Sequence, residues 1–474
     1  MNDILDLIRP NRSALFGFFS MMPKGGDLHH HYSGSVYTES YIDYIFQKDV
    51  YVNERTMEIS IDIANLSDEI KKEWKKISQV ENKDKLKLEL LRLWSVKDFV
   101  KGAHSSDEHF FSTFPAFTIP SKANYIENLK ELKKRALNQK LSYLETIFIS
   151  ADTRNIKVTG KEDIDKRCLG YQANKDEASL FVELDQLYQK YHPAVKIQAN
   201  VHTDNIEALH SESGVEDEDF VLRFQNYVAR YKQPVDLFID LFTCFHSCND
   251  SKLISGVNIV AAENGETAMR DYWLHTMFFK FLEKKYPDVR YAIHAGELVG
   301  GMVQPENLGT HIRQSLVLNN LKRIGHAVDI IYDNEFTSTI RKLQEKQIAI
   351  EINLSSNEFI LSVSHDLHPV EIYYTNNIPI VICTDDEGVL RTSITEQYVL
   401  LAHRYKLTYS QIKEVVKNSI VYSHLENNNV RQRLLKKLEK DFEKFEKEIF
   451  EFYQPIVSPE GNFEQLKFQS KHFL

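Results

Sequence analysis

The sequence predicts an α/β fold, a (β/α)8 barrel of the TIM type with helical insertions. Three observations support this prediction. Short apolar, β-branched segments recur along the chain, and several are almost continuously hydrophobic, as in strands buried on both faces of a sheet. Segments with the helical spacing of apolar residues separate the later ones, and strands that alternate with helices form parallel sheets. Eight such strands are the number that closes this kind of barrel.

The expected strands share a short length and an apolar centre, and the helical patterns between them are longer. The clearest helical patterns are at residues 270–287 and 334–347. The expected strands are 27–31, 141–149, 195–202, 256–262, 290–295, 322–327, 348–354 and 378–384.

The barrel is expected to occupy residues 23–425, after a helical lead-in at 1–22 and before a helical extension at 426–474. Two long stretches interrupt its rhythm. The stretch at about 35–140 is mostly helical and charged in pattern, and the one at about 203–255 begins with an acidic, loop-like segment. Long insertions of this kind commonly shape the mouth of a barrel.

The tail at 430–453 carries apolar residues at helical spacing, which predicts an amphipathic helix packed on the outside of the barrel. A homodimer formed through a short coiled coil is the alternative, although the run holds few heptads. The apolar residues are Leu434, Leu438, Phe442, Phe445, Ile449 and Phe452.

The composition excludes several classes of protein. The 474 residues include 58 Lys and Arg against 68 Asp and Glu, a net charge of −10, which disfavours a nucleic-acid binder because phosphate contacts need clustered cations. Four cysteines do not make a disulfide scaffold. The apolar run at 14–22 is too short to span a bilayer, and Asp3 and Asp6 weaken its likeness to a signal peptide. We therefore expect a cytoplasmic protein without membrane partners.

The stretch LHHHYSG at 28–34 is the first unusual feature. On a strand, His29 and His31 point to the same face and His30 to the other. Two imidazoles that project into a barrel suit a metal ion, but a polar loop with hydrogen-bonded histidines explains this triplet equally well when it is taken alone.

Later strands favour the metal. Polar residues follow the expected strands at their carboxyl ends, which is the face where barrel enzymes keep their chemistry. Buried imidazoles and adjacent carboxylates without a partner would be costly, whereas His nitrogens and an Asp oxygen form a ligand set that suits zinc with one position left for water. The residues are His294, Glu297, His326, Ser356, Asn357, Asp385 and Asp386.

These segments resemble the signatures of the adenosine deaminase family. MPKGGDLHHHYSG is similar to its opening HxH motif, and HAGE, RIGHA, SSN and TDDEG are similar to the other four, in order, from about residue 22 to about residue 400. The lead-in MPKGG and FFSTF at 110–114 resemble the longer branch of adenosine-deaminase-like growth factors. The resemblance implies one Zn²⁺ per chain held by His29, His31, His294 and Asp385, with Glu297 as the acid that protonates the purine and with His326 and Asp386 holding and deprotonating the attacking water.

Four further residues are expected to contact the substrate: Ser33, Ala261, Gly296 and Phe111. Ser33 stands where many family members have an acidic residue near the ribose, and Ala261 follows the expected fourth strand. Phe111 lies with Trp94, Phe110 and Phe114 in the first insertion, where these aromatics form either a lid over the purine or the core of a helical subdomain. His202, at the end of the expected third strand, faces either the pocket or a polar partner.

The predicted function is the hydrolytic deamination of a 6-aminopurine nucleoside, adenosine or deoxyadenosine, to inosine or deoxyinosine and ammonia. Bound zinc lowers the pKa of water, and an acid at the ring nitrogen makes C6 electrophilic. The H-x-E…P-C-x-x-C signature of cytidine deaminases is absent. The alternatives are the same chemistry on adenine, an N6-substituted purine or a nucleotide, and a purine-binding signalling protein.

Overall fold

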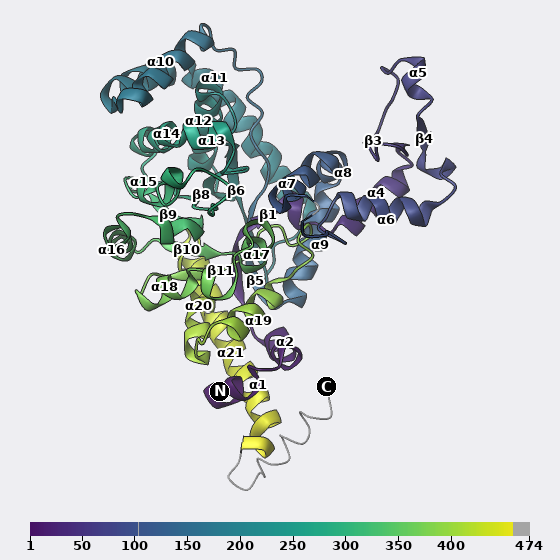
Figure 1. Ribbon diagram of the computed structural model, residues 1–474, viewed down its shortest axis with the longest axis vertical. Coiled ribbons are helices and arrows are strands. Elements are labelled where there is room, and N and C mark those ends of the chain that lie inside the picture. Colours follow the sequence, from purple (N-terminus) through teal and green to yellow (C-terminus); the bar gives the residue numbers. More distant parts are fainter. Residues whose placement is uncertain (103, 458–474) are drawn as a thin grey trace.

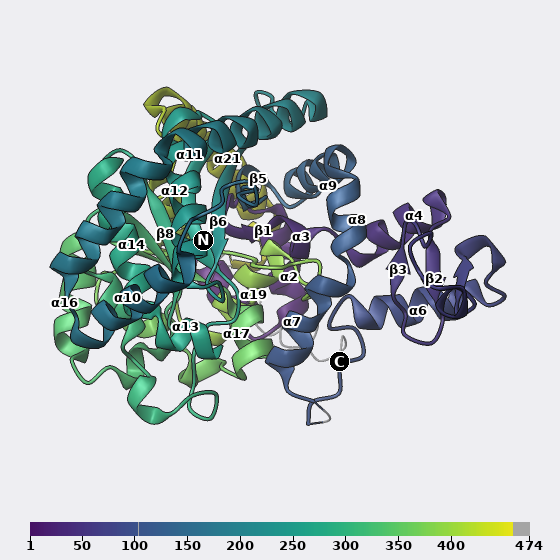
Figure 2. The same cartoon turned by 90° about the horizontal axis from the view of Figure 1, so that it is seen from above.

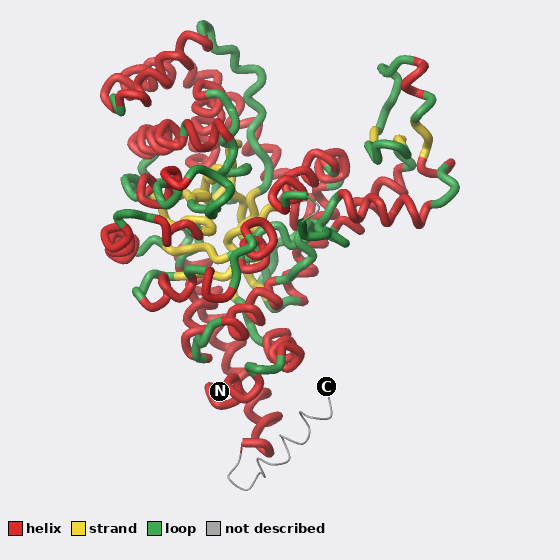
Figure 3. Tube along the Cα trace, viewed as in Figure 1, coloured by secondary structure: helices red, strands yellow, loops and turns green. Residues whose placement is uncertain are grey.

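The computed structural model describes residues 1–102 and 104–457, with side chains up to residue 453. Eight parallel strands form one sheet whose neighbours follow chain order, and Figure 3 shows these strands at the centre with helices around them. The predicted α/β barrel is therefore confirmed. Its strands are β1 (Gly25–His31), β5 (Leu141–Ile147), β6 (Val221–Ala229), β7 (Ile254–Val260), β8 (Tyr291–Ala295), β9 (Leu321–His326), β10 (Ala349–Ile352) and β11 (Ile380–Ile382).

Backbone contacts between β1 and the segment after β11 close the ring. His30 pairs in parallel with Asp385. The His31 N–H donates to the Asp385 carbonyl at 3.1 Å, and the Asp385 N–H donates to the His29 carbonyl at 2.9 Å. The first and last strands of the barrel thus bring two predicted metal-binding segments into direct contact.

The third strand was predicted at the wrong place. Residues 195–202 lie inside the long helix α11 (Glu177–Ser213), and β6 is the third barrel strand. Alternating apolar residues at 195–201 imitate a strand, but Val195, Ala199 and Ile206 are buried at helical spacing whereas Ile197 is 61% exposed. The segment 203–255 is correspondingly wrong as an insertion, because it contains β6 and the barrel helix α12 (Pro234–Asp250).

Helices cover the outside of the barrel and follow most strands, as expected for this architecture. The predicted helices at 270–287 and 334–347 are α14 and α16. Besides α11 and α12, the helices after β5 are α10 (Lys161–Asn174), α13 (Glu266–Arg270), α14 (Tyr272–Lys285), α15 (His311–Ser315), α16 (Phe336–Lys346), α17 (Leu354–Leu361), α18 (Val370–Thr375), α19 (Ile394–Arg404) and α20 (Tyr409–Val421).

The first excursion separates β1 from β5 and is mainly helical, as predicted. Figures 1 and 2 show part of it projecting from the barrel as an arm that ends in the small antiparallel sheet β3-β2-β4. Its elements are α3 (Tyr32–Ser35), α4 (Thr38–Lys48), β2 (Tyr51–Asn53), β3 (Ile59–Ser60), α5 (Asp68–Lys71), β4 (Trp74–Lys76), α6 (Lys83–Leu93), α7 (Ser106–Ala116), α8 (Thr118–Ala123) and α9 (Tyr125–Asn138).

The two ends of the described chain pack together at the base of the barrel. The lead-in forms α1 (Asn2–Ile8) and α2 (Arg12–Met21), and the tail forms α21 (Asn428–Val457). Phe445 of α21 meets Phe18 of α2 with ring centroids 5.1 Å apart. The tail helix therefore packs on its own chain, although Phe452, expected on its apolar face, is 70% exposed. The boundaries at residues 22 and 425 and the homodimer stay predictions.

None of the described helices combines the length and the apolar character needed to cross a membrane.

Candidate functional site

The predicted metal-binding side chains meet at the carboxyl ends of the strands. His29 and His31 project from the end of β1 into the barrel, whereas His30 points the other way and its Nδ1 lies 2.9 Å from the Thr146 hydroxyl. His294 comes from β8, and Asp385 follows β11. The alternation expected from the sequence therefore places two of the three adjacent histidines in the site.

The donor atoms of these residues lie close together. The Nε2 atoms of His29 and His31 are 3.4 Å apart, and those of His31 and His294 are 3.1 Å apart. Asp385 Oδ1 lies 3.3 Å from His29 Nε2 and 3.4 Å from His31 Nε2. A cluster of this kind, with carboxylate and imidazole ligand atoms in mutual reach, has the composition of a metal centre.

The spacing fits a small tetrahedral cation. Ligand bonds of about 2.0–2.1 Å to zinc place neighbouring donor atoms about 3.3 Å apart. The Nε2 atoms of His31 and His294, 3.1 Å apart, are within the separation expected for two ligands of one such cation. Both the geometry and the chemistry of the donor set therefore suit zinc.

Buried acceptors orient two of the histidines. Glu351 Oε2 lies 2.6 Å from His29 Nδ1, and Asn258 Oδ1 lies 2.9 Å from His294 Nδ1. Each acceptor holds a proton on Nδ1, so the Nε2 lone pair faces the centre. Such partners fix the tautomer and the ring orientation of metal-ligating histidines.

Glu297 lies beside this cluster and is held through its backbone. The Glu297 N–H donates to Glu263 Oε2 at 2.8 Å, and the preceding Gly296 N–H donates to Glu263 Oε1 at 2.9 Å. Burial, together with the charges of Asp385 and Glu263, raises the pKa of Glu297 well above its usual value. This shift favours the protonated side chain, which is the state that a general acid needs.

His326 and Asp386 also lie next to the donor cluster. His326 Nε2 is 4.0 Å from Asp385 Oδ2, and its Nδ1 is 3.6 Å from Glu297 Oε1. Burial lowers the pKa of His326 to about 3, so the imidazole is neutral. Asp386 Oδ1 is buried and has no hydrogen-bond partner among the described residues. The arrangement thus supplies one neutral imidazole and one free carboxylate oxygen.

Backbone strain accompanies these positions. Ala261, His326 and Asp385 all have a left-handed conformation, with φ of 84°, 65° and 63°. Such conformations cost about 1–3 kcal/mol at residues other than glycine and collect at functional sites. At these three strand ends the fold therefore holds the residue in a strained backbone conformation that positions it at the site.

A cavity of about 980 Å³ opens above the cluster and reaches His31, Glu297, His326, Asp385 and Asp386. Three of the four predicted substrate contacts line it: Ser33, Ala261 and Phe111. Gly296 does not line it, and the Gly296 N–H is engaged by Glu263. Gly296 instead shapes the loop, because its φ is +79° and an added Cβ would lie 2.5 Å from Asp329 Oδ1.

Both readings of the aromatic residues in the first insertion hold in part. Phe110, Phe111 and Phe114 of α7 line the cavity, whereas Trp94 is fully buried and does not. His202 lies within α11, not at a strand end, and its Nε2 is 2.8 Å from Asn226 Oδ1, which corrects its expected place in the fold.

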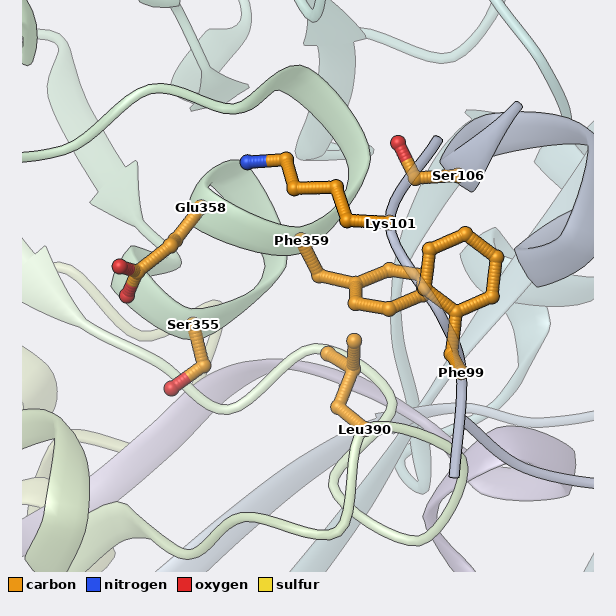
Figure 4. A pocket seen from close by; sticks show the side chains of 7 residues that line it. All are labelled: Phe99, Lys101, Ser106, Ser355, Glu358, Phe359 and Leu390. Atoms are coloured by element: carbon orange, nitrogen blue, oxygen red, sulfur yellow. The ribbon is translucent and has the colours of Figure 1, made fainter. Parts of the chain in front are cut away.

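A second cavity, of about 320 Å³, is lined in part by Ser355, Glu358 and Phe359 of α17 (Figure 4). The rings of Phe99 and Phe359 stand 5.0 Å apart there, with Lys101 and Glu358 nearby. None of the predicted site residues lines it, so the chemistry belongs to the larger cavity.

Sequence reasoning gave no role to Glu263, Glu351 or Asn258, the residues that orient Glu297, His29 and His294. Glu351 carries a weak signal, because it is a carboxylate in the centre of an otherwise apolar strand, IAIEINL. Charged residues are almost never fully buried unless they are paired, so such a position marks a buried partner.

Comparison with known proteins agrees with this geometry. Residues 190–441, more than half of the chain, match the family described as adenosine deaminase. The match includes His294, Glu297, His326, Asp385 and Asp386, and the HxH pair lies before it.

The chain is similar to two individual relatives and to one solved structure. An N6-methyl-AMP deaminase from Bos taurus is 31% identical over 145 residues, 30% of this chain and 38% of that protein. An adenosine deaminase from Clostridium kluyveri is 28% identical over 203 residues, 42% of this chain and 53% of that protein. The chain thus spans about half or less of each relative's length. The apo structure of an N6-methyl-AMP deaminase from Arabidopsis thaliana superposes with a TM-score of 0.56 at 16% identity, over 90% of this chain and 98% of that one, and supports the fold.

Proposed function

Because the chain belongs to the adenosine deaminase family, we propose that it removes the exocyclic amino group of an aminopurine by hydrolysis, with adenosine or deoxyadenosine as the first substrate to test. One observation carries the proposal: three of the four metal-binding side chains, those of His31, His294 and Asp385, border one cavity together with Glu297 and Asp386. The cavity also has an aromatic wall, which suits a flat purine ring.

We assign the metal as one Zn²⁺ per chain, held by His29, His31, His294 and Asp385. Zinc bound by such ligands lowers the pKa of a water molecule to about 7. The assignment is supported by the donor spacing and by the acceptors that hold a proton on Nδ1 of His29 and His294.

The protein's own groups carry the other steps. Glu297 gives its proton to the purine ring nitrogen next to C6, which makes C6 electrophilic. Water attacks C6 and loses a proton to a neighbouring base, which passes this proton to N6. The C6–N6 bond then breaks, ammonia leaves, and the proton of the C6 hydroxyl restores the acid form of Glu297. The Glu263 carboxylate keeps the backbone at Glu297 in place because it accepts the N–H groups of Gly296 and Glu297. The aromatic residues of α7 cover the ring and limit the access of bulk water.

The test is a direct assay. Purified, zinc-supplemented protein is incubated with adenosine, and the loss of adenosine absorbance and the release of ammonia are followed together. The Glu297→Gln variant serves as control, because its side chain matches in size but does not donate an acidic proton. Equal loss of adenosine with both proteins, or no activity on any aminopurine, contradicts the proposal.

A second substrate class is favoured by a specific feature of the cavity. Lys122, Arg154 and Lys232 line it, and a phosphorylated or N6-substituted purine nucleotide would use such cations. Arg154 pairs with Asp152 at 2.7 Å and Lys232 pairs with Asp240, which leaves Lys122, exposed and without an ion pair among the described residues, as the most available. Competition between adenosine, AMP and N6-methyl-AMP at equal concentration distinguishes the two classes.

A further inference from the structure

Three histidines of the site are His29 of β1, His294 of β8 and His326 of β9. They differ in the group that faces the Nδ1 atom of the ring. In His29 and His294 the neighbour is an acceptor: Glu351 Oε2 in the first case and Asn258 Oδ1 in the second. The orientation of the Asn258 amide is fixed, because the same Oδ1 also accepts the Ile259 backbone N–H at 2.9 Å. Both rings therefore carry hydrogen on Nδ1 and offer a lone pair on Nε2.

His326 has the opposite arrangement, and a backbone amide sets it. The Val370 N–H, which can only donate, lies 3.2 Å from His368 Nδ1. Burial lowers the pKa of His368 to about 3, so the ring is neutral and its remaining hydrogen is on Nε2. His368 Nε2 then donates to Asn357 Oδ1 at 3.0 Å.

The amide of Asn357 transmits this orientation to His326. With its oxygen turned to His368, its Nδ2 donates to His326 Nδ1 at 3.0 Å. Asn353 Nδ2 approaches the same nitrogen at 3.3 Å as a second donor. Reversing the Asn357 amide would place its NH2 group against the Nε2–H of His368, two donors facing each other. The Val370 N–H therefore fixes every orientation along this series of hydrogen bonds. His326 is left with hydrogen on Nε2, directed toward Asp385.

We propose that His368 and Asn357 are positioning residues that hold His326 in the Nε2–H tautomer. In this tautomer His326 donates a hydrogen bond to the oxygen of the attacking water, while Asp386 accepts the proton that the water loses. This inference rests on the proposed function. The resemblance implied that His326 and Asp386 together hold and deprotonate the water, whereas this inference gives each residue a separate part. It also separates His326 from the metal ligands, which need the Nε2 lone pair.

The surroundings of Asp386 support its part. Its Oδ1 has no hydrogen-bond partner within the described part of the chain, so this oxygen is available to a water molecule. The space around this oxygen depends on Gly34, where an added Cβ would lie 1.7 Å from it. The fold therefore leaves space and an unpartnered oxygen at Asp386 for the attacking water.

The first test reads the tautomer itself. Full-length, zinc-supplemented protein with ¹⁵N-labelled histidine is studied by NMR, and the His326→Gln variant assigns the His326 signals. The expected result is an unprotonated Nδ1 and a protonated Nε2 on His326. A protonated Nδ1 overturns the inference. Because this readout needs no turnover, an enzyme inactive on every aminopurine would reject the proposed function separately.

The second test reverses the relay. In Asn357→Asp the new carboxylate only accepts, so it pulls the hydrogen of His326 onto Nδ1. We expect kcat to fall by at least about 100-fold with KM nearly unchanged, since the wrong histidine tautomer costs about 10⁴-fold in a serine protease triad. An unchanged tautomer in this variant, or a reversed tautomer with wild-type kcat, overturns the inference.

His368 offers a matched pair of variants. The amide introduced by His368→Gln can accept from the Val370 N–H and donate to Asn357, so it can make the same two hydrogen bonds as His368. We therefore expect this variant to keep the His326 tautomer and a kcat within about threefold of the wild type. His368→Phe has neither, and its His326 signals should show a mixture of tautomers. A single Nε2–H tautomer in His368→Phe overturns the relay.

Discussion

Two neighbouring clusters of buried ionisable groups in the barrel are joined by the contact between His29 and Glu351, and they balance their charge differently. In the deeper cluster Arg323 lies between Glu145 and Glu351 and donates to both, and all three side chains are fully buried. In the upper cluster, which holds three imidazoles and the adjacent Asp385 and Asp386, no Lys or Arg among the described residues pairs with either aspartate, and Asp385 contacts histidines instead.

This difference indicates what each cluster needs. A buried carboxylate is tolerated when a guanidinium pairs with it in good geometry, and the deeper cluster meets that condition from within the chain. The upper cluster meets it only when a cation is added, and its donor atoms are spaced for one. The same protein interior thus shows a structural and a functional solution to buried charge, and four variants can separate them.

The largest effect is expected at the upper cluster, in Glu297→Gln. Loss of a general acid lowers kcat by about 10²–10⁴-fold, while the metal content stays at the wild-type level because Glu297 is not one of the assigned ligands. In the wild type, kcat should fall as the pH rises through the raised pKa of Glu297, since only the protonated acid acts. The exposed Glu306→Gln is the control. A kcat near the wild-type value in Glu297→Gln would remove Glu297 from the reaction.

The next effect is expected at the deeper cluster, in Arg323→Met. The variant leaves Glu145 and Glu351 buried without their partner, which should lower the free energy of unfolding by about 3–5 kcal/mol. Denaturant unfolding measures this change. Arg323→Lys keeps a charge but loses the fork geometry, so its loss should be smaller. A change below about 1 kcal/mol in Arg323→Met, within the range of surface substitutions, would show that the cluster is not held by this pair.

The link between the clusters gives an intermediate effect. Glu351→Gln weakens the hydrogen bond that orients His29 and should lower metal affinity by about 10–100-fold. Glu145→Gln is the matched control, since Glu145 shares Arg323 with Glu351 but does not contact His29. Competition with a chromogenic chelator measures both affinities. Equal affinities in the two variants would argue that Glu351 does not orient the ligand.

The smallest effect concerns pH and a third buried carboxyl group. Burial, and then the charge of Glu263, raises the pKa of Asp329 to about 8. Between about pH 4 and 8 the folded protein therefore holds a proton that the unfolded chain releases, so this contribution to stability is lost as the pH rises through 8. Asp329→Asn should flatten the decline in unfolding free energy that the wild type shows between pH 5 and 8. Parallel urea titrations at pH 5, 6.5 and 8 compare the slopes, and identical slopes contradict the assignment.

Local patterns in the sequence predicted seven of the eight strands near their observed places and the residues that converge at their ends. They succeeded because strand alternation and the direction of a parallel sheet are set by neighbouring residues. The third strand was missed because alternating apolar residues within α11 imitate a strand and because acidic residues precede β6.

The contacts that orient the site were beyond such patterns. His29 and Glu351 are 322 residues apart, and their contact depends on the order of strands around the ring. The relay from Val370 through His368 and Asn357 likewise depends on how α17 and α18 pack. The motifs could indicate which residues act, whereas the hydrogen bonds that fix their protons needed the fold.

The metal content of the purified protein tests the central claim most directly. Elemental analysis of full-length protein supplied with zinc and freed of excess ion should give about one zinc per chain, and a folded His294→Ala variant treated in the same way should have lost most of it. A folded wild-type protein without stoichiometric metal, or a His294→Ala variant that keeps the full amount, would contradict the account.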